Sequence, residues 1–244
     1  MGRRADAQRT ARRASVLARQ RQESRRRAWL VSAVAVAVLL VAALAGIGVW
    51  QAGRSGEVAV PPGATAGGTG LAVGDGPVTV EVYLDFLCPA CRQFDQASRP
   101  VLAGYLADGT VTVVYRPIAI LDQQSTTRFS TRAAAAAGCV GGGSAMDGFV
   151  TGMMASQPPE GTAGLTDDEI IQIGVEAGAG GGTGPGGESF GRCVRDGTYH
   201  DWAERNTELA SQRGVRGTPT VFVDGTLLEL RTVETLVEAI ENAA

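Results

Sequence analysis

An apolar segment that runs directly into two closely spaced cysteines is the strongest constraint on how this chain can fold. Residues 78–86 are dominated by Val, Thr, Tyr and Phe, which is typical of a buried β-strand. Cys88 and Cys91 follow at once, and residues 89–106 are predicted to form a helix. This helix starts at Pro89, and proline is favoured in a first turn. A strand and a helix joined this closely place both cysteines at the N-terminus of the helix.

The remaining strands and helices follow one another in an order that predicts an α/β sheet. They are a strand at 111–115, a helical block at about 122–214, strands at 220–223 and 227–230, and a helix at 232–242. Asp224 and Gly225 separate the last two strands, and Asp-Gly between apolar runs is a strong signal of a β-hairpin. The sequence therefore predicts a βαβ half, a helical insertion and a ββα half.

The four cysteines do not have the spacing of a metal site. A zinc site built from cysteines alone normally uses two closely spaced pairs. Here Cys88 and Cys91 form one such pair, whereas Cys139 and Cys193 each stand alone, and His200 is the only histidine. We therefore expect neither a bound metal nor another cofactor.

The position of Cys88 favours redox chemistry. The dipole and free N–H groups of a helix N-terminus stabilise negative charge, so they should lower the pKa of this thiol. The resulting thiolate would be a good nucleophile and a good leaving group. Cys91, one turn further on, would resolve a mixed disulfide, and the neighbouring Pro89 and Ala90 fill the turn without adding charge. An inert disulfide between the two cysteines is the alternative that these residues leave open.

A second motif supports the redox interpretation. Thr218 and Pro219 directly precede the strand at 220–223, where a proline is tolerated only at the strand start or edge. Three features occur together: Cys-Pro-Ala-Cys after a strand, Gly-Thr-Pro-Thr before a later hairpin, and a helical insertion between them. In this combination the chain resembles the DsbA-like branch of the thioredoxin superfamily, in particular its exported, membrane-anchored members. The resemblance covers roughly residues 77–244.

The resemblance implies a role for each residue of the two motifs. Cys88 would be the exposed nucleophile and Cys91 its buried partner. Pro219 would follow a cis peptide bond and pack against the active-site disulfide. The backbone of Thr218 would pair with a substrate peptide in an extended conformation.

One position departs from the family pattern. Many members carry a buried acid six residues before the first cysteine, and here that residue is Val82. Glu81 and Asp85 are the nearest acids, and either could relay the proton of Cys91. Both could equally be solvated or structural, so the sequence leaves the proton acceptor open.

The resemblance also implies a second, structural disulfide between Cys139 and Cys193 in the helical insertion. An even number of cysteines in an exported chain agrees with this pairing. The long loop that it closes would make the bond worth about 4 kcal/mol. The alternatives are two buried free thiols and a second redox pair that relays electrons.

The charge distribution separates an N-terminal segment from the rest of the chain. Residues 1–50 hold ten Arg against two acidic residues, a net charge of +8. Residues 51–244 hold twelve Arg against 23 acidic residues, a net charge of −11. Residues 28–50 carry no charge over 23 residues, which is long enough to cross the hydrocarbon core of a membrane. Arg-rich flanks such as residues 1–27 stay in the cytoplasm.

These features predict a cell-membrane protein that crosses the bilayer once. Residues 1–27 would be cytoplasmic, 28–50 a transmembrane helix, 51–76 a flexible linker rich in Gly, Ala and Pro, and 77–244 the extracytoplasmic domain. A cleaved signal peptide is the alternative, because Ala43-Leu44-Ala45 resembles a cleavage site. The long uncharged stretch favours an anchor. The Arg run would then orient the chain, and no nucleic-acid partner is expected.

The predicted activity is thiol–disulfide exchange with exported proteins. The Cys88–Cys91 disulfide would oxidise free cysteines of these substrates. A membrane reoxidase of the DsbB or vitamin-K-epoxide-reductase type, implied by the resemblance only, would restore it. A disulfide reductase or isomerase is the alternative within the same class. A different class is a non-catalytic thioredoxin-fold module that holds an extended peptide beside Pro219.

Overall fold

The computed structural model describes residues 58–181, 185–229 and 232–244 of the chain. The predicted cytoplasmic segment at 1–27 and the predicted transmembrane helix at 28–50 lie outside these residues. Within the described ranges, no helix combines the length and the hydrophobicity needed to cross a membrane.

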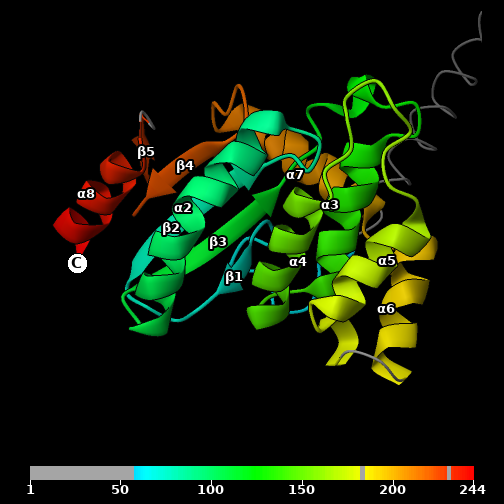
Figure 1. Ribbon diagram of the computed structural model, residues 1–244, viewed down its shortest axis with the longest axis horizontal. Helices are drawn as coiled ribbons and strands as arrows, with labels where there is room; N and C mark the ends of the chain where they lie inside the picture. Colours follow the sequence, from blue (N-terminus) through cyan, green and yellow to red (C-terminus); the bar gives the residue numbers. More distant parts are fainter. Residues whose placement is uncertain (1–57, 182–184, 230–231) are drawn as a thin grey trace, which may run out of the picture. The chain divides into compact units, whose positions relative to one another are not determined.

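A five-stranded mixed sheet forms the centre of the fold (Figure 1). Its strands are β1 (Leu71–Val73), β2 (Val78–Leu84), β3 (Val111–Pro117), β4 (Thr220–Val223) and β5 (Thr226–Leu228), in the spatial order β1-β3-β2-β4-β5. β2 and β3 are parallel, and all other neighbours are antiparallel. Six of the seven residues of β2 are buried, because helices cover both faces of this central strand.

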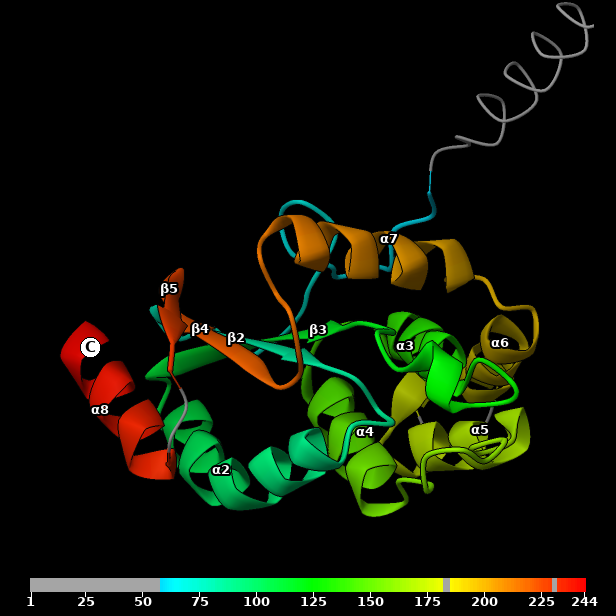
Figure 2. The same cartoon turned by 90° about the horizontal axis from the view of Figure 1, so that it is seen from above.

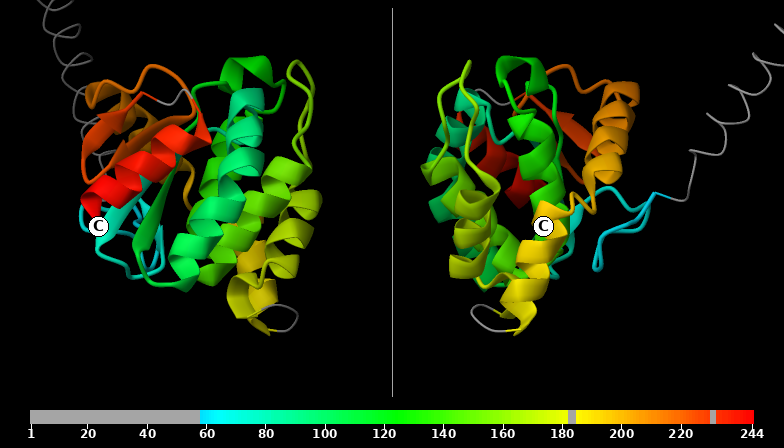
Figure 3. Two further views of the ribbon diagram at one scale, coloured as in Figure 1. Left: turned by 60° about the vertical axis from the view of Figure 1, so that its left-hand side comes forward. Right: turned by 90° about the vertical axis from the view of Figure 1, so that its right-hand side faces the viewer.

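The helices form two groups. They are α2 (Pro89–Ala107), α3 (Phe129–Val140), α4 (Ser144–Ala155), α5 (Asp167–Glu176), α6 (Pro185–Arg195), α7 (His200–Gln212) and α8 (Val233–Ala243), with short 3₁₀ helices η1 (Asp122–Gln124) and η2 (Ala179–Gly181). α2 and α8 lie on one side of the sheet and α7 on the other (Figure 2). α3 to α6 form a separate block beside the sheet (Figure 3). The predicted α/β fold with a helical insertion between a βαβ and a ββα half is confirmed.

A run of alanines forms the centre of the helical block. Ala133–Ala137 of α3 are all buried, and α3 packs against α4, α5, α6 and α7. Small side chains allow these neighbouring helices to approach closely, because the distance between helix axes depends on the residues at the contact. Larger buried side chains of α4 and α7, such as Phe149 and Trp202, belong to the same hydrophobic core.

The prediction of a flexible linker at 51–76 is wrong for its C-terminal part. Residues 71–73 form the edge strand β1, whose first and last residues are buried and which pairs antiparallel with β3. Upstream, the indole N–H of Trp202 in α7 donates to the carbonyl oxygen of Gly68. A strand of three residues among Gly and Ala has too short a pattern to be found in the sequence. The folded domain therefore starts earlier than the predicted boundary at residue 77.

The predicted hairpin turn lies where the sequence places it. Asp224 and Gly225 connect β4 to β5, with φ angles of +45° and +79°. Positive φ at both central positions matches the twist of the flanking strands, which explains the strong preference for Asp-Gly in such turns.

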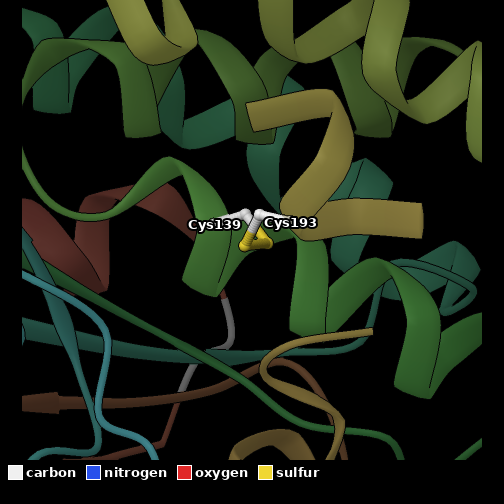
Figure 4. Close-up of a disulfide and its surroundings, with 2 residues drawn as sticks. All are labelled: Cys139 and Cys193. Carbon is white, nitrogen blue, oxygen red and sulfur yellow. A yellow bond between two sulfur atoms is a disulfide. The ribbon is translucent and has the colours of Figure 1, made fainter. Parts of the chain in front are cut away.

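A disulfide bond joins Cys139, near the end of α3, to Cys193 in α6 (Figure 4). The two Cα atoms are 5.9 Å apart, and 54 positions of sequence separate them. The loop that the bond closes contains α4 and α5, so it constrains most of the insertion. This pair is the one that the family resemblance implies.

We expect the double substitution Cys139→Ser with Cys193→Ser to lower the free energy of unfolding by about 2–5 kcal/mol. The physical reason is that the unfolded chain regains the conformational freedom that the closed loop removes. Urea unfolding without reductant measures the loss. The double variant should keep the wild-type rate of exchange at Cys88, since neither serine replaces a residue of that pair. An unchanged unfolding midpoint would contradict the structural role of this disulfide. A much slower exchange at Cys88 would show instead that Cys139 and Cys193 take part in the exchange reaction.

Candidate active site

Cys88 stands at the junction between β2 and α2, where it forms the N-cap of α2. Its backbone is extended (φ −75°, ψ 116°), and Pro89 occupies the start of the helix. The Cys88 thiol donates a hydrogen bond to the carbonyl oxygen of Thr218 at 3.2 Å. This contact is possible because β4 runs antiparallel beside β2, with Thr220 opposite Tyr83, so that the residues before β4 pass the end of β2.

The structure thus brings the two motifs of the sequence together. The peptide bond between Thr218 and Pro219 is cis. Pro89 and Ala90 are exposed between the two cysteines. Cys88 and Cys91 are both free thiols, and within the described residues no group of three His, Cys, Asp or Glu side chains could hold a metal ion.

The environment of Cys88 favours its thiolate. A hydrogen bond from the Cys91 thiol is the strongest influence, and it lowers the pKa of Cys88 to about 5 together with the Thr218 side chain and the backbone N–H groups of Cys91 and Ala90. These donors outweigh the burial that would raise the pKa. The Thr218 hydroxyl oxygen is buried and has no hydrogen-bond partner in the described part of the chain, so its proton is available to the thiolate.

Cys91 has the opposite environment. Burial raises the pKa of this thiol far above its ordinary value, and the hydrogen bond to Cys88 and the negative charge of Cys88 act in the same direction. Cys91 is 1% exposed, against 7% for Cys88. Cys88 is therefore the more accessible and more acidic thiol, although it is less exposed than the resemblance implies. The division between a reactive sulfur and a protonated partner suits stepwise disulfide exchange.

Asp85 lies at the active site and is fully buried. Its carboxylate accepts hydrogen bonds from the N–H groups of Leu87 and Leu121, each at 2.9 Å, and from the Ser130 hydroxyl at 2.7 Å. Burial raises the pKa of Asp85 to about 6, and the charge of Cys88 adds to this effect while the three donors oppose it. A carboxyl that titrates near neutral pH within reach of the charge on the nucleophile is a candidate for proton transfer.

Glu81 does not join the site. It lies one residue before Val82 on β2, so its side chain points to the opposite face of the sheet. There it accepts hydrogen bonds from Arg213 at 2.7 and 2.8 Å and from Arg116 at 2.5 Å. Burial alone would raise the pKa of Glu81, but the hydrogen bonds and charges of Arg213 and Arg116 lower it overall. The ion pair gives Glu81 a structural environment remote from Cys91.

A small cavity of about 20 Å³ is lined by both Cys91 and Val82. Its polar lining consists of Asp95, Ser98, Arg99, Tyr115 and Asp147. This volume is enough for one water molecule when polar partners surround it. The position that often carries the family acid is therefore apolar here, while carboxylates from α2 and α4 reach the same cavity.

Sequence reasoning missed the polar residues that the helical insertion adds to the site. Ser130 of α3 donates to Asp85, and Asp147 of α4 reaches the cavity beside Cys91. Nothing in the local sequence marks either residue, because their role depends on how the insertion packs on the sheet. Asp95 follows Cys91 by four residues, a helical spacing that places both on one face of α2. That spacing was the one available signal.

Comparisons with known proteins agree with this fold. Residues 68–242 match the family model described as thioredoxin. The oxidised crystal structure of DsbA from Mycobacterium tuberculosis is similar, with a TM-score of 0.60 at 30% identity, covering 71% of this chain and 91% of that one. The reduced form of DsbG from the same organism has a TM-score of 0.58 at 29% identity, covering 77% of this chain and 83% of that one.

A curated relative of a different kind also matches. PknE of M. tuberculosis, a serine/threonine-protein kinase, is 30% identical over 163 residues, which cover 62% of this chain and 27% of the kinase. This chain therefore spans about a quarter of the length of that relative. The similarity supports no statement about kinase activity in this chain.

The fold is that of a thioredoxin-like protein, and the two free cysteines at the start of α2 are its candidate active site. The match over residues 68–242 shows that the chain belongs to the thioredoxin family. Within this family it is a DsbA-like thiol–disulfide oxidoreductase.

We expect the thiolate of Cys88 in the reduced protein to form with a midpoint near pH 5. Above this pH the fraction of thiolate, and with it the rate of alkylation by iodoacetamide, should be close to its maximum already at pH 7. The substitution Cys91→Ala removes the strongest donor and should move the midpoint to higher pH. Absorbance of the thiolate at 240 nm measures both midpoints. A midpoint that Cys91→Ala leaves unchanged would contradict the assigned cause.

Proposed function

We propose that this protein is a membrane-anchored, extracytoplasmic oxidant that introduces disulfide bonds into exported proteins. The observation that carries the proposal is the environment of Cys88, which lowers its pKa to about 5. A stabilised thiolate favours the reduced form of the enzyme, so its disulfide is readily given to a substrate. This pKa lies below the value of about 7 for thioredoxin and above the value of about 3.5 for DsbA.

The proposed reaction has two exchange steps. A substrate thiolate attacks the Cys88 sulfur of the enzyme disulfide, the bond to Cys91 breaks, and Cys91 leaves with the electron pair and takes up a proton. A second substrate thiolate then attacks the substrate sulfur of the mixed disulfide, and Cys88 leaves as a thiolate. The substrate gains one disulfide and loses two electrons, which remain on Cys88 and Cys91. A membrane reoxidase of the DsbB or vitamin-K-epoxide-reductase type then removes these electrons.

The residues around Cys88 supply the other parts of the mechanism. Its low pKa makes Cys88 the better leaving group in the second step, whereas the protonated Cys91 is held back from the reverse attack. The backbone of Thr218 would pair with the extended substrate, next to the sulfur that is attacked. Asp85 is our candidate for exchanging a proton with the site.

The direction of electron flow is set by the reduction potential of the Cys88–Cys91 pair. A potential of about −120 mV is that of a strong oxidant such as DsbA, and one of about −270 mV is that of thioredoxin. Equilibration with a glutathione buffer of known composition gives the value. A potential near the thioredoxin value would replace the oxidant proposal by a reductase or isomerase.

The oxidised protein should restore activity to a reduced, unfolded secreted enzyme that needs its disulfides. The substitution Cys88→Ser removes the sulfur that is attacked and should reduce the rate of reactivation to the uncatalysed background. The substitution Cys91→Ala removes the enzyme disulfide, so this variant is first converted to a mixed disulfide between Cys88 and glutathione. A substrate with one free cysteine then displaces glutathione as a thiolate, and the resulting mixed disulfide should persist, because neither Cys91 nor a second substrate thiol is present to attack it. Non-reducing gel electrophoresis detects them. A Cys88→Ser variant with the full rate of reactivation would contradict the proposed exchange at Cys88, and a wild-type protein no faster than the background would favour a non-catalytic peptide-binding module.

The location of the protein has a separate test. In bacteria that produce the full chain, it should remain with the membrane fraction after alkaline carbonate extraction, with residues 77–244 open to external protease in spheroplasts. Replacing Leu39 and Leu40 with Arg should weaken insertion, since each charge near the centre of a span costs about 2.5–3.5 kcal/mol. A mature protein that begins after Ala45 would show a cleaved signal peptide instead of an anchor.

A further inference from the structure

The side chain of Gln157 joins the helical insertion to the active-site turn. Gln157 follows α4, and its amide nitrogen donates to the carbonyl oxygens of Phe86 at 3.0 Å and of Cys88 at 2.9 Å. A side-chain amide has two N–H donors, so these two bonds use both of them. The amide therefore holds the backbone on both sides of Leu87, immediately before α2.

The carbonyl oxygen of Cys88 accepts hydrogen bonds from several donors. It also accepts hydrogen bonds from the N–H groups of Cys91 at 3.0 Å and Arg92 at 3.3 Å, the first bonds of α2. The amide of Gln157 adds a donor that does not belong to the helix. Because the carbonyl is part of the rigid Cys88–Pro89 peptide plane, holding it restricts the orientation of the first turn.

The position of Gln157 is itself determined by the insertion. Its amide nitrogen lies 3.8 Å from the sulfur of Met154 in α4. Phe149 of α4 packs edge-on against Phe86, with ring centroids 5.7 Å apart and an interplanar angle of 75°. α4 thus contacts the active-site turn through an aromatic pair and through this amide. A displacement of α4 along the turn would change both contacts together.

We propose that Gln157 is a positioning residue for disulfide exchange, because its amide holds the carbonyls of Phe86 and Cys88 and so keeps the N–H groups of the first turn directed at the Cys88 sulfur. The proposal deepens the proposed function and rests on it. It assigns the helical insertion a part in the chemistry, through a residue that neither touches the substrate nor reacts.

The expected effect follows from which groups stabilise the thiolate. The backbone N–H groups of Cys91 and Ala90 are among the donors that lower the pKa of Cys88. Without the amide of Gln157, the peptide planes of this turn are less restricted. The two N–H groups then form hydrogen bonds to the Cys88 sulfur for a smaller fraction of the time. The thiolate then loses stabilisation, and the equilibrium moves toward the disulfide.

The substitution Gln157→Met tests the proposal, since it keeps the length of the side chain and removes both donors. We expect the midpoint of Cys88 ionisation to rise and the equilibrium constant with glutathione to move about three- to tenfold toward the disulfide, the equivalent of one hydrogen bond. The matched control is Gln172→Met in α5. Gln172 is an exposed glutamine whose amide bonds to Glu176, and its replacement should change neither quantity.

A second variant keeps the test valid if Gln157→Met folds poorly. Gln157→Asn retains the amide but is one carbon shorter, so it should shift both quantities in the same direction. If folded variants show the wild-type midpoint and the wild-type glutathione equilibrium, and differ only in thermal stability, the positioning role is wrong. If instead wild-type Cys88 and Cys91 form no disulfide with glutathione, the proposed function fails, and the ionisation midpoints still decide the role of Gln157.

Discussion

The hydrogen bond from the Cys88 thiol to the carbonyl of Thr218 joins the two halves of the fold at the reactive sulfur. It depends on the antiparallel pairing of β2 with β4, which brings the residues that enter β4 to the end of β2. Because these two strands are neighbours, the long insertion between them in sequence leaves their contact in space intact. The junction of β2 with α2 then places the remaining parts of the site, namely the N–H groups of the first turn, the buried thiol of Cys91 and the carboxylate of Asp85.

The two acids nearest the cysteines, Glu81 and Asp85, have different surroundings because of where they stand in and after β2. Val82 faces the cavity beside the resolving thiol, and Glu81 faces the other side of the sheet, where Arg116 and Arg213 neutralise it. Asp85 follows the end of the strand, and its carboxylate accepts hydrogen bonds from two backbone N–H groups and one hydroxyl. An acid paired with two arginines keeps its charge, whereas an acid held by neutral donors in a buried site can change protonation near neutral pH. The active site therefore contains the acid that responds to the charge on the nucleophile.

The sequence was sufficient for the parts of this structure that depend on neighbouring residues. The strand before Cys88, the helix after it and the Asp224-Gly225 turn all follow from local patterns of hydrophobicity and backbone preference. The edge strand at 71–73 was missed because three residues make no pattern. Glu81 was a candidate because one position in sequence separates it from Val82, although the pleat of the strand sends the two to opposite faces. Gln157 could not be found at all, since its role arises from the docking of the insertion on the sheet.

The disulfide between Cys139 and Cys193 has a consequence for how the protein matures. Under the proposed function, a newly exported copy would acquire this bond in the same compartment in which the enzyme makes such bonds for other chains. Until then it would present two thiols 54 positions apart, and it would itself be a substrate for a finished copy. The first molecules made would acquire this bond from another oxidant, and later ones could acquire it from their predecessors, so that new copies would be stabilised faster as the protein accumulates.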